Sequence, residues 1–267
     1  MNVNFFENKN ILLIGATGGL GIHLASKLCN LKSNLILTGT NDKNLSELKS
    51  KIDIRHKLIN LNLLNSQSVK NFLIKINKKE NIDIVINCVG INYFSETKKL
   101  KYYQVLDIFK INVISIINIT SYILRKNILN NNGIFVNIGS VFGEIGYPLF
   151  NTYCSTKFAL HGFSECLRRE LSDSNMKVIY ISPRAINTKL NSSEVNNLNS
   201  FYKNTVDSPE FVCDFILNII SKNKSVVSSI GWKESFLIKI NKFNYRITDN
   251  FFKKNIKTIK KFLNQHN

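Results

Sequence analysis

The segment ILLIGATGGLG, residues 11–21, joins an apolar run to a turn that contains four glycines. The run at 11–15 has the length and near-continuous apolar character of a strand buried on both faces. The residues after the turn, LASKLCNL at 24–31, have the apolar spacing of a helix. A glycine turn in this position lets the backbone approach a pyrophosphate, and the helix N-terminus offers free N–H groups. Such turns also serve only to connect strand and helix, so the surrounding pattern has to decide.

The alternation of short apolar runs and helical segments continues along the chain. Further strands are predicted at 35–39, 83–90, 133–140 and 177–183. Helical spacing is found at 45–52, 69–76, 105–124 and 158–171. Alternating strands and helices build right-handed crossovers around a parallel sheet. The sequence therefore predicts an α/β fold, a Rossmann-type doubly wound parallel sheet with helices on both faces, followed by a C-terminal helical extension.

The composition favours a globular protein in a reducing compartment. Of the 267 residues, 44% are hydrophobic. No apolar run is expected to approach the roughly 18–20 residues of a membrane span. The first ten residues lack the basic and apolar regions of a secretory signal, and the five cysteines are scattered without metal-like spacing. We therefore expect a cytoplasmic protein.

The formal net charge of +18 is compatible with a nucleic acid, an anionic membrane or an acidic partner. The chain is also crowded with Asn, Lys and Ile, the residues that an AT-rich genome would favour. No compact basic cluster with interleaved aromatic residues precedes the C-terminal segment, so we expect no nucleic acid partner. His23 and His161 lie in predicted helices without partners at metal-ligand spacing, so we expect no metal site.

The one predicted domain boundary lies near residue 230. Residues 1–230 are expected to form a dinucleotide-binding catalytic domain, and residues 231–267 a basic amphipathic helical tail. The apolar residues of the tail fall on one face of each of two helical segments, namely Trp232, Phe236, Ile240 and Phe243, then Phe252, Ile256, Ile259 and Leu263. The opposite faces of the second segment carry Lys253, Lys254, Lys257, Lys260 and Lys261. The apolar faces either dock on the same subunit or a dimer partner, or attach peripherally to the anionic inner face of a membrane.

The stretch YCSTK, residues 153–157, places a tyrosine and a lysine four positions apart at the start of a predicted helix. Side chains at i and i+4 share a helix face, and a lysine ammonium beside a phenol lowers the pKa of the phenol. Tyr153 could then donate or accept a proton near neutral pH. The alternative is that Tyr153 packs in the core while Lys157 extends its ammonium to water.

Several motifs, in order from about residue 9 to 190, resemble those of the short-chain dehydrogenase/reductase family. The residues that carry the resemblance are Gly15, Gly19 and Gly21 of the turn, Asn87 to Gly90 in NCVG, Asn112 in KINVIS, Ser140 in NIGSVFG, and Tyr153 with Lys157. The glycine turn and NIGSVFG are similar to those of 3-oxoacyl-thioester reductases. The sequence departs from the family at Asn62, where many relatives carry aspartate, and at Arg184, where glycine is common.

The resemblance implies that Tyr153 delivers a proton to a carbonyl oxygen as hydride arrives from a nicotinamide, and acts as the base in the reverse direction. Lys157 is expected to lower the pKa of Tyr153 and to bind the nicotinamide ribose. Ser140 would hold the carbonyl oxygen, and Asn112 would position a water that links Lys157 to solvent. The residues expected to contact the cofactor are Gly15, Thr17, Gly18, Gly19, Leu20, Gly21, Thr40, Asn41, Asn62, Leu63, Asn87, Gly90, Tyr153, Lys157, Pro183, Ile186 and Thr188.

The end of the second strand, LTGTND, lacks a carboxylate at the position that would bind the ribose 2′-hydroxyl of NAD. Asp42 is expected to act instead as the cap of a helix that starts near Lys43. NADP(H) is therefore favoured over NAD(H), with Thr40, Asn41 and Lys43 near the 2′-phosphate.

The expected substrate is a small carbonyl or alcohol, with an acyl thioester as one candidate because a basic enzyme suits an acidic carrier. Glu144 and Tyr147 are candidates for the substrate mouth, and residues 185–205 for a mobile lid. We expect a homo-oligomer, a dimer or a tetramer. The alternative function is a catalytically inactive cofactor-binding or regulatory protein with the same fold, since a fold alone does not establish activity.

Overall fold

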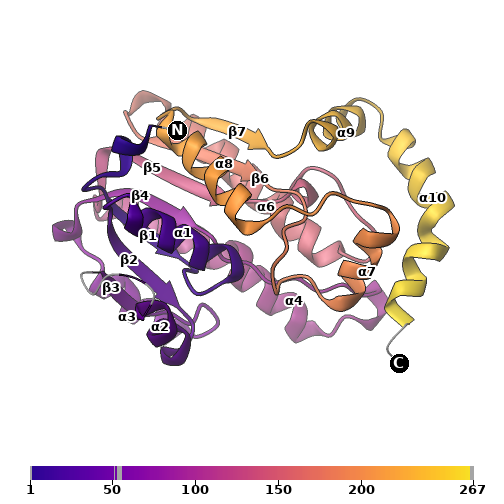
Figure 1. Ribbon diagram of the computed structural model, residues 1–267, viewed down its shortest axis with the longest axis horizontal. Coiled ribbons are helices and arrows are strands. Elements are labelled where there is room, and N and C mark those ends of the chain that lie inside the picture. Colours follow the sequence, from indigo (N-terminus) through magenta and orange to yellow (C-terminus); the bar gives the residue numbers. More distant parts are fainter. Residues whose placement is uncertain (1, 51, 53–55, 265–267) are drawn as a thin grey trace.

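The computed structural model describes residues 2–50, 52 and 56–264, and its centre is a seven-stranded parallel sheet. The strands are β1 (Asn10–Ile14), β2 (Asn34–Gly39), β3 (Lys57–Asn60), β4 (Ile82–Asn87), β5 (Leu129–Ile138), β6 (Lys177–Ser182) and β7 (Val226–Ser229). Their order across the sheet is β3-β2-β1-β4-β5-β6-β7, as Figure 1 shows. The order reverses between β1 and β4, and ligands bind outside the carboxyl ends of parallel strands at such a point.

The five predicted strands and the doubly wound fold are confirmed. The edge strands β3 and β7 were not predicted, because each has only four residues and little apolar sequence to distinguish it from a loop. The central strands β1 and β4 are almost wholly buried, which explains their near-continuous apolar sequences.

The helices are α1 (Gly19–Asn30), α2 (Asp42–Lys49), α3 (Ser66–Lys75), α4 (Tyr102–Phe109), α5 (Ser115–Arg125), α6 (Asn151–Glu170), α7 (Ser193–Phe201), α8 (Pro209–Ser221), α9 (Trp232–Phe243) and α10 (Tyr245–Lys261). Helices α1 and α8 form the main cover of one sheet face, with Leu24 and Ile216 fully buried between them and the strands. Helices α3, α5 and α6 contribute Phe72, Ile119 and Leu167 to the core on the other face. Lys51 of the helix expected at 45–52 lies outside the described residues.

The long helix expected at 105–124 is interrupted at its centre. A π-helical segment, Lys110–Ile114, separates α4 from α5, and such segments are frequent at functional sites. Taken together with the π-helical segment, the helical run Tyr102–Arg125 is long and apolar enough to span a membrane by length and composition, contrary to the sequence-based expectation. Because Ile108, Ile116, Ile119 and Ile123 are buried in the core, this run is a helix of the folded domain.

The C-terminal extension consists of α9 and α10, which lie at the end of the molecule opposite β3 (Figure 1). The predicted apolar face of α10 packs on the domain, where Ile259 is fully buried against Leu149 and Leu198. The predicted apolar face of α9 does not pack in this way, since Trp232 is 77% exposed and Phe243 is 94% exposed. Residues 265–267 of the expected tail lie outside the described part of the chain.

Candidate active site

The glycine turn after β1 has no room for side chains at three of its glycines. Gly15 has φ +88°, and a Cβ on it would lie 2.7 Å from the Val89 side chain. A Cβ on Gly21 would lie 2.0 Å from the Gly15 carbonyl oxygen, and one on Gly19 would lie 2.7 Å from the Thr188 Cβ. Gly18 is the N-cap of α1, and Leu20 lies buried in the first helical turn. Side chains are therefore excluded at Gly15, Gly19 and Gly21, and the Gly19 backbone packs directly against Thr188.

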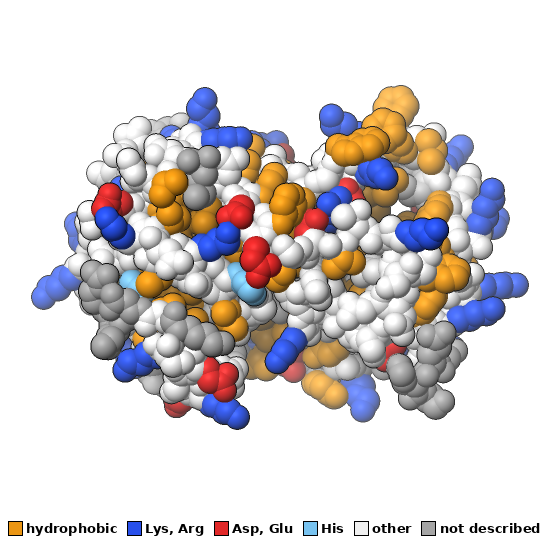
Figure 2. All heavy atoms as spheres, viewed as in Figure 1, with side chains coloured by type: hydrophobic (Ala, Val, Ile, Leu, Met, Phe, Trp, Pro, Cys, Tyr) orange, Lys and Arg blue, Asp and Glu red, His pale blue; other side chains and the backbone are white. Residues whose placement is uncertain are grey.

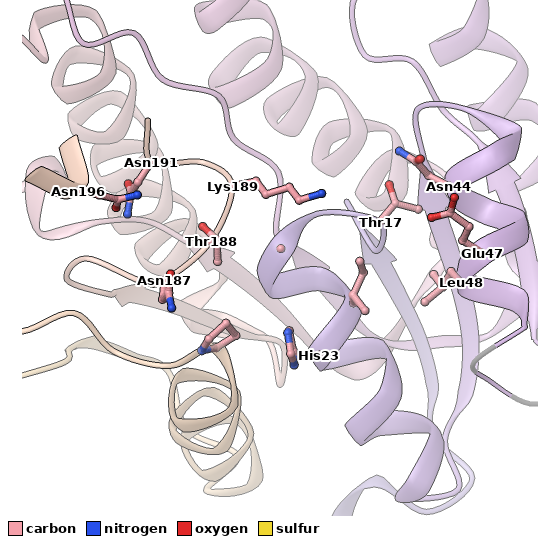
Figure 3. A pocket seen from close by; sticks show the side chains of 13 residues that line it. Thr17, His23, Asn44, Glu47, Leu48, Asn187, Thr188, Lys189, Asn191 and Asn196 are labelled. Atoms are coloured by element: carbon pink, nitrogen blue, oxygen red, sulfur yellow. The ribbon is translucent and has the colours of Figure 1, made fainter. Parts of the chain in front are cut away.

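A cleft of about 660 Å³ opens beside this turn, between α1, α2 and the loop after β6 (Figure 3). Of the residues expected to contact the cofactor, Thr17, Gly19 and Thr188 line it. The other lining residues, which the sequence did not single out as cofactor contacts, are Ile22, His23, Asn44, Glu47, Leu48, Asn187, Lys189, Asn191, Asn196 and Pro209. In Figure 3 the Lys189 side chain points from its loop toward Thr17 and Asn44.

The loop after β6 is held in position by its own backbone and side chains. The Pro183 carbonyl accepts a hydrogen bond from the Val141 N–H (3.0 Å), and Ile186 pairs with Asp207 in an isolated bridge. The Asn191 amide donates to the Ile186 carbonyl (2.9 Å). Part of the segment expected to act as a lid is the helix α7, whose Val195 and Leu198 are buried.

The turn after β2 differs from the prediction in one detail. Asn41, not Asp42, is the N-cap of α2, and its Oδ1 accepts a hydrogen bond from the Asn44 N–H (2.8 Å). Asp42 is the first residue of the helix and accepts from the Asn60 amide on β3 (2.9 Å). Thr40 is exposed at the end of the strand, and a Cβ on Gly39 would meet the Thr17 side chain at 2.5 Å. Asp42 is therefore held by a partner on β3.

The remaining predicted cofactor residues lie at the ends of β3 and β4. Asn62 is exposed, and its Oδ1 accepts from the Leu64 N–H (3.0 Å), while Leu63 is buried. Asn87 is 1% exposed and donates to Asn137 Oδ1 (2.7 Å), which leaves Asn87 Oδ1 without a hydrogen-bond partner. A Cβ on Gly90 would lie 3.6 Å from the Lys157 Nζ, so the absence of a side chain keeps the space beside that ammonium open.

Tyr153 lies in the first turn of α6 and is 8% exposed, with its side chain hydrogen-bonded to Ser140. Ser140 follows β5 and accepts a hydrogen bond from the Phe142 N–H (3.1 Å) through its hydroxyl. The Tyr153 ring packs edge-on against Phe142 and Phe150. The structure thus brings the predicted serine and tyrosine together at the carboxyl end of the sheet.

Lys157 lies one helical turn after Tyr153 and is 3% exposed. Its Nζ donates to the Ile138 carbonyl (3.0 Å) and lies 5.7 Å from the centre of the Tyr153 ring. The alternative in which Lys157 reaches water is therefore wrong. Burial lowers the pKa of Lys157 to about 8 and raises the pKa of Tyr153 to about 12.

The expectation that Lys157 depresses the pKa of Tyr153 is wrong, because the pKa of Tyr153 is raised. Desolvation is the largest cause of the Tyr153 shift, and the hydrogen bond with Ser140 opposes it only in part. Tyr153 is thus a protonated phenol at neutral pH, which is the state that can donate a proton.

Asn112 lies in the π-helical segment and is fully buried. Its amide group accepts from the Ile91 N–H (2.9 Å) and donates to the Ile91 carbonyl (3.0 Å) and to Thr156 Oγ1 (3.0 Å). Asn112 therefore fastens the segment after β4 to α6. A Cβ on Gly90 would lie 3.8 Å from its Oδ1, so Asn112 and Lys157 border the same space.

Two other residues considered for the substrate mouth have defined partners. Glu144 is 5% exposed and accepts from Ser182 Oγ (2.8 Å) and from Lys242 Nζ on α9 (3.0 Å). Tyr147 stacks on Phe142 (4.9 Å between ring centres) and packs edge-on against Phe252 of α10 (5.1 Å). Among the described residues no group of three or more His, Cys, Asp or Glu side chains is placed to hold a metal ion.

The bare glycine turn, the adjoining cleft and the open space at Gly90 fit an extended dinucleotide that runs from the N-terminus of α1 toward Lys157. Side chains at Gly15, Gly19 or Gly21 would collide with their neighbours, and one at Gly90 would narrow the space beside Lys157. The loop after β6 forms the opposite wall of the cleft.

The comparisons with known proteins point to one family. A family model described as short chain dehydrogenase matches residues 9–199. A 3-oxoacyl-[acyl-carrier-protein] reductase from Aquifex aeolicus is 28% identical over 232 residues, which cover 83% of this chain and 94% of that protein. An NADP-dependent 3-hydroxy acid dehydrogenase from Schizosaccharomyces pombe is 26% identical, with coverage of 83% and 90%.

Solved structures share the fold at lower identity. A short-chain dehydrogenase from Streptomyces avermitilis superposes with a TM-score of 0.77 at 19% identity, covering 94% of this chain and 99% of that one. A short chain dehydrogenase from Burkholderia cenocepacia, solved in complex with NADP, gives 0.75 at 18% identity, with coverage of 85% and 98%.

Proposed function

Because the chain belongs to the short-chain dehydrogenase family, and is thus an oxidoreductase that acts on alcohol or carbonyl groups with NAD(P), we propose that it reduces a carbonyl to an alcohol with NADPH. The observation that carries the proposal is the placement of the buried Tyr153 and Lys157 beside Ser140 at the carboxyl end of β5. In this group the tyrosine keeps its proton at neutral pH, as a proton donor requires.

Each residue of the group has a role that its environment supports. Tyr153 donates the proton to the carbonyl oxygen, and the Ser140 hydroxyl, already hydrogen-bonded to Tyr153, holds that oxygen in place. Lys157, as an ammonium, stabilises the phenolate that remains and approaches the cofactor ribose through the space at Gly90. The bound nicotinamide supplies the hydride. Asn112 acts as a positioning residue, because its amide fixes Ile91 and Thr156 on either side of the site.

The binding of the dinucleotide is assigned to the turn and cleft beside α1. The N–H groups at the start of α1 receive the pyrophosphate, with Thr17, Gly19 and Thr188 around it. The preference for NADP(H) is supported by the neutral Thr40 and Asn41 after β2 and by the engagement of Asp42 with Asn60. Lys189 adds a cation to the cleft, whereas Glu47 adds a carboxylate there.

The proposed substrate class is a 3-oxoacyl thioester. The support comes from relatives that are named as 3-oxoacyl-[acyl-carrier-protein] reductases, and from the aromatic cluster beside Tyr153. The net charge of +18 suits an acidic carrier or a thioester with phosphate groups. The alternative, a cofactor-binding protein without turnover, is opposed by the complete set of Asn112, Ser140, Tyr153 and Lys157.

The test is a rate assay of the purified protein with NADPH or NADH and a panel of 3-oxoacyl thioesters and simple ketones. We expect oxidation of NADPH in the presence of the thioesters, with a lower kcat/KM for NADH. Binding of NADPH without turnover of any panel member would favour the inactive alternative. Turnover of ketones alone would overturn the substrate class and leave the reaction type standing.

A further inference from the structure

The amphipathic helix α9 is turned so that its aromatic stripe faces solvent. Trp232, Phe236, Lys239 and Phe243 lie along one side of the helix because they are spaced by three, four or seven residues. Trp232 is 77% exposed, Phe236 60% and Phe243 94%. These four residues are called the α9 face below. Figure 2 shows hydrophobic side chains gathered over α9 at the upper right, with cationic side chains beside them.

The opposite side of α9 is fixed to the domain by buried and charged contacts. Ile238 is 5% exposed and packs with Val141 and Ile145. Lys242 pairs with the buried Glu144 (3.0 Å). Glu234 receives a hydrogen bond from Arg184 (3.4 Å), which also binds Asp207 through two nitrogens. To bury the α9 face against its own domain, the helix would have to rotate. It would then lose the ion pairs of Glu234 and Lys242 and the packing of Ile238.

Two further large apolar side chains are exposed just after the end of α9. Tyr245 and Ile247, in the first turn of α10, are 61% and 54% exposed. Soluble monomers rarely expose large apolar side chains together, so such a surface marks a binding region.

The charges that α9 leaves at its exposed surface are positive. Its three lysines are Lys233, Lys239 and Lys242 and its one acidic residue is Glu234, while the other lysines of the tail lie on α10. Glu234 is engaged with Arg184 on the inner side of the helix. Lys233 lies over the Trp232 ring (5.8 Å), and Lys239 lies within the stripe itself. The partner of this surface must therefore accept aromatic rings and provide negative charge.

We propose that the α9 face is a docking site for an anionic lipid bilayer, an interaction beyond the oxidoreductase function. Tryptophan, tyrosine and phenylalanine insert at the level of the lipid headgroups, while lysines reach the phosphates. A second copy of the chain fits less well, because a symmetric contact through this face would bring two sets of lysines together and remove them from water. The buried stripe of α10 takes no part in the docking.

Trp232 is the only tryptophan of the chain, so its fluorescence reports on this face alone. The full-length protein is mixed with vesicles of phosphatidylcholine, or of phosphatidylcholine with phosphatidylglycerol, at low and high salt. We expect the emission to shift to shorter wavelength, and the protein to float with the vesicles, in the anionic mixture at low salt. High salt should reverse both effects, because it screens the lysines.

A double variant, Phe236→Ala with Phe243→Ala, keeps the tryptophan and removes two exposed rings. We expect it to bind anionic vesicles about tenfold or more weakly, since each ring contributes buried apolar area in the interface. The matched control is Phe211→Ala on α8, which removes a ring that is 50% exposed outside the tail and should bind like the wild type.

The proposal is overturned by an emission that stays unchanged with anionic vesicles at low salt, or by equal losses in the double variant and the control. The proposal is also overturned if, without vesicles, the emission of the wild type shifts as the protein concentration rises while that of the double variant does not. This outcome would assign the α9 face to contact with a second copy of the chain. Failure of vesicle binding would leave the rate assay unaffected, so this test is independent of the proposed reaction.

Discussion

At the scale of single residues, the environment of Tyr153 decides what it can do. Burial among the surrounding rings keeps the phenol protonated, and Ser140 lowers its pKa only in part. Tyr153→Phe should therefore lower kcat by about 10²–10⁴-fold, the usual contribution of proton transfer. The dissociation constant for NADPH should stay near the wild-type value because the ring still packs. The control is Tyr122→Phe on α5, outside the site, and a Tyr153→Phe enzyme as fast as this control would contradict the assignment.

The titration of Lys157 makes stability depend on pH in a defined window. Its pKa is lowered from 10.5 to about 8 by burial in the folded state. Between these values the unfolded chain binds more protons than the folded one, so the free energy of unfolding rises with pH there. Compared with Lys157→Met, the wild type should gain on the order of 2 kcal/mol from pH 8 to pH 10. Denaturant unfolding of both proteins across this range measures the difference, and parallel curves would contradict the buried ammonium.

At the scale of elements, the turn between β2 and α2 governs the choice of cofactor. Thr40 is exposed at the end of the strand, whereas Thr38 is 1% exposed and accepts a hydrogen bond from the Gly15 N–H. Thr40→Asp should therefore place a carboxylate where the 2′-phosphate of NADP would be repelled. We expect the ratio of kcat/KM for NADPH to that for NADH to fall by about ten- to a hundredfold, equivalent to roughly 1.4–2.8 kcal/mol.

The matched control in this turn is Asp42→Asn. The Asp42 carboxylate is bound to the Asn60 amide, so its neutralisation should leave the cofactor ratio unchanged. A cofactor ratio that changed in Asp42→Asn but not in Thr40→Asp would contradict the placement of Thr40 beside the 2′-phosphate. Equilibrium binding of both cofactors supports the kinetic ratio with a measurement independent of turnover.

Features with a local cause could be predicted from the sequence. The glycine turn, the Tyr–Lys spacing and the strand pattern are encoded within a few neighbouring residues, and the structure contains all three. The capping of α2 was assigned to the wrong neighbour because Asn and Asp are almost equally good caps. Lys189 and Asn187 were missed because only the folded chain brings the loop after β6 opposite α1. The pKa of Tyr153 was misjudged because spacing says nothing about desolvation.

At the scale of the whole molecule, the tail connects the surface to the site. Phe252 of α10 packs on Tyr147, Tyr147 stacks on Phe142, and Phe142 contacts Tyr153. Helix α9 holds Glu144 through Lys242. The sequence identified the two amphipathic segments but not which apolar face packs on the domain. The domain offers Leu149 and Leu198 to α10, so the apolar face of α10 is buried there. It offers Arg184 and Glu144 to α9, so α9 is held by ion pairs and its aromatic face stays exposed.

The packing of α10 against the domain can be tested with two isoleucines of the same helix. Ile259 is fully buried among Leu149, Leu198 and Phe262, whereas Ile247 is 54% exposed. Ile259→Ala should lower the free energy of unfolding by about 2–5 kcal/mol because it leaves a cavity. Ile247→Ala should change it by no more than about 0.5 kcal/mol.

The same pair separates a structural from a functional effect of the tail. If α10 supports the aromatic wall beside Tyr153, Ile259→Ala should also raise the KM for the carbonyl substrate at a temperature where the variant is still folded. The dissociation constant for NADPH should be unchanged, because none of the described residues that line the cofactor cleft belongs to α10. If Ile259→Ala is destabilised but its KM is unchanged, α10 contributes to stability and not to substrate binding. If the two variants are equally stable, the packing of Ile259 against the domain is contradicted.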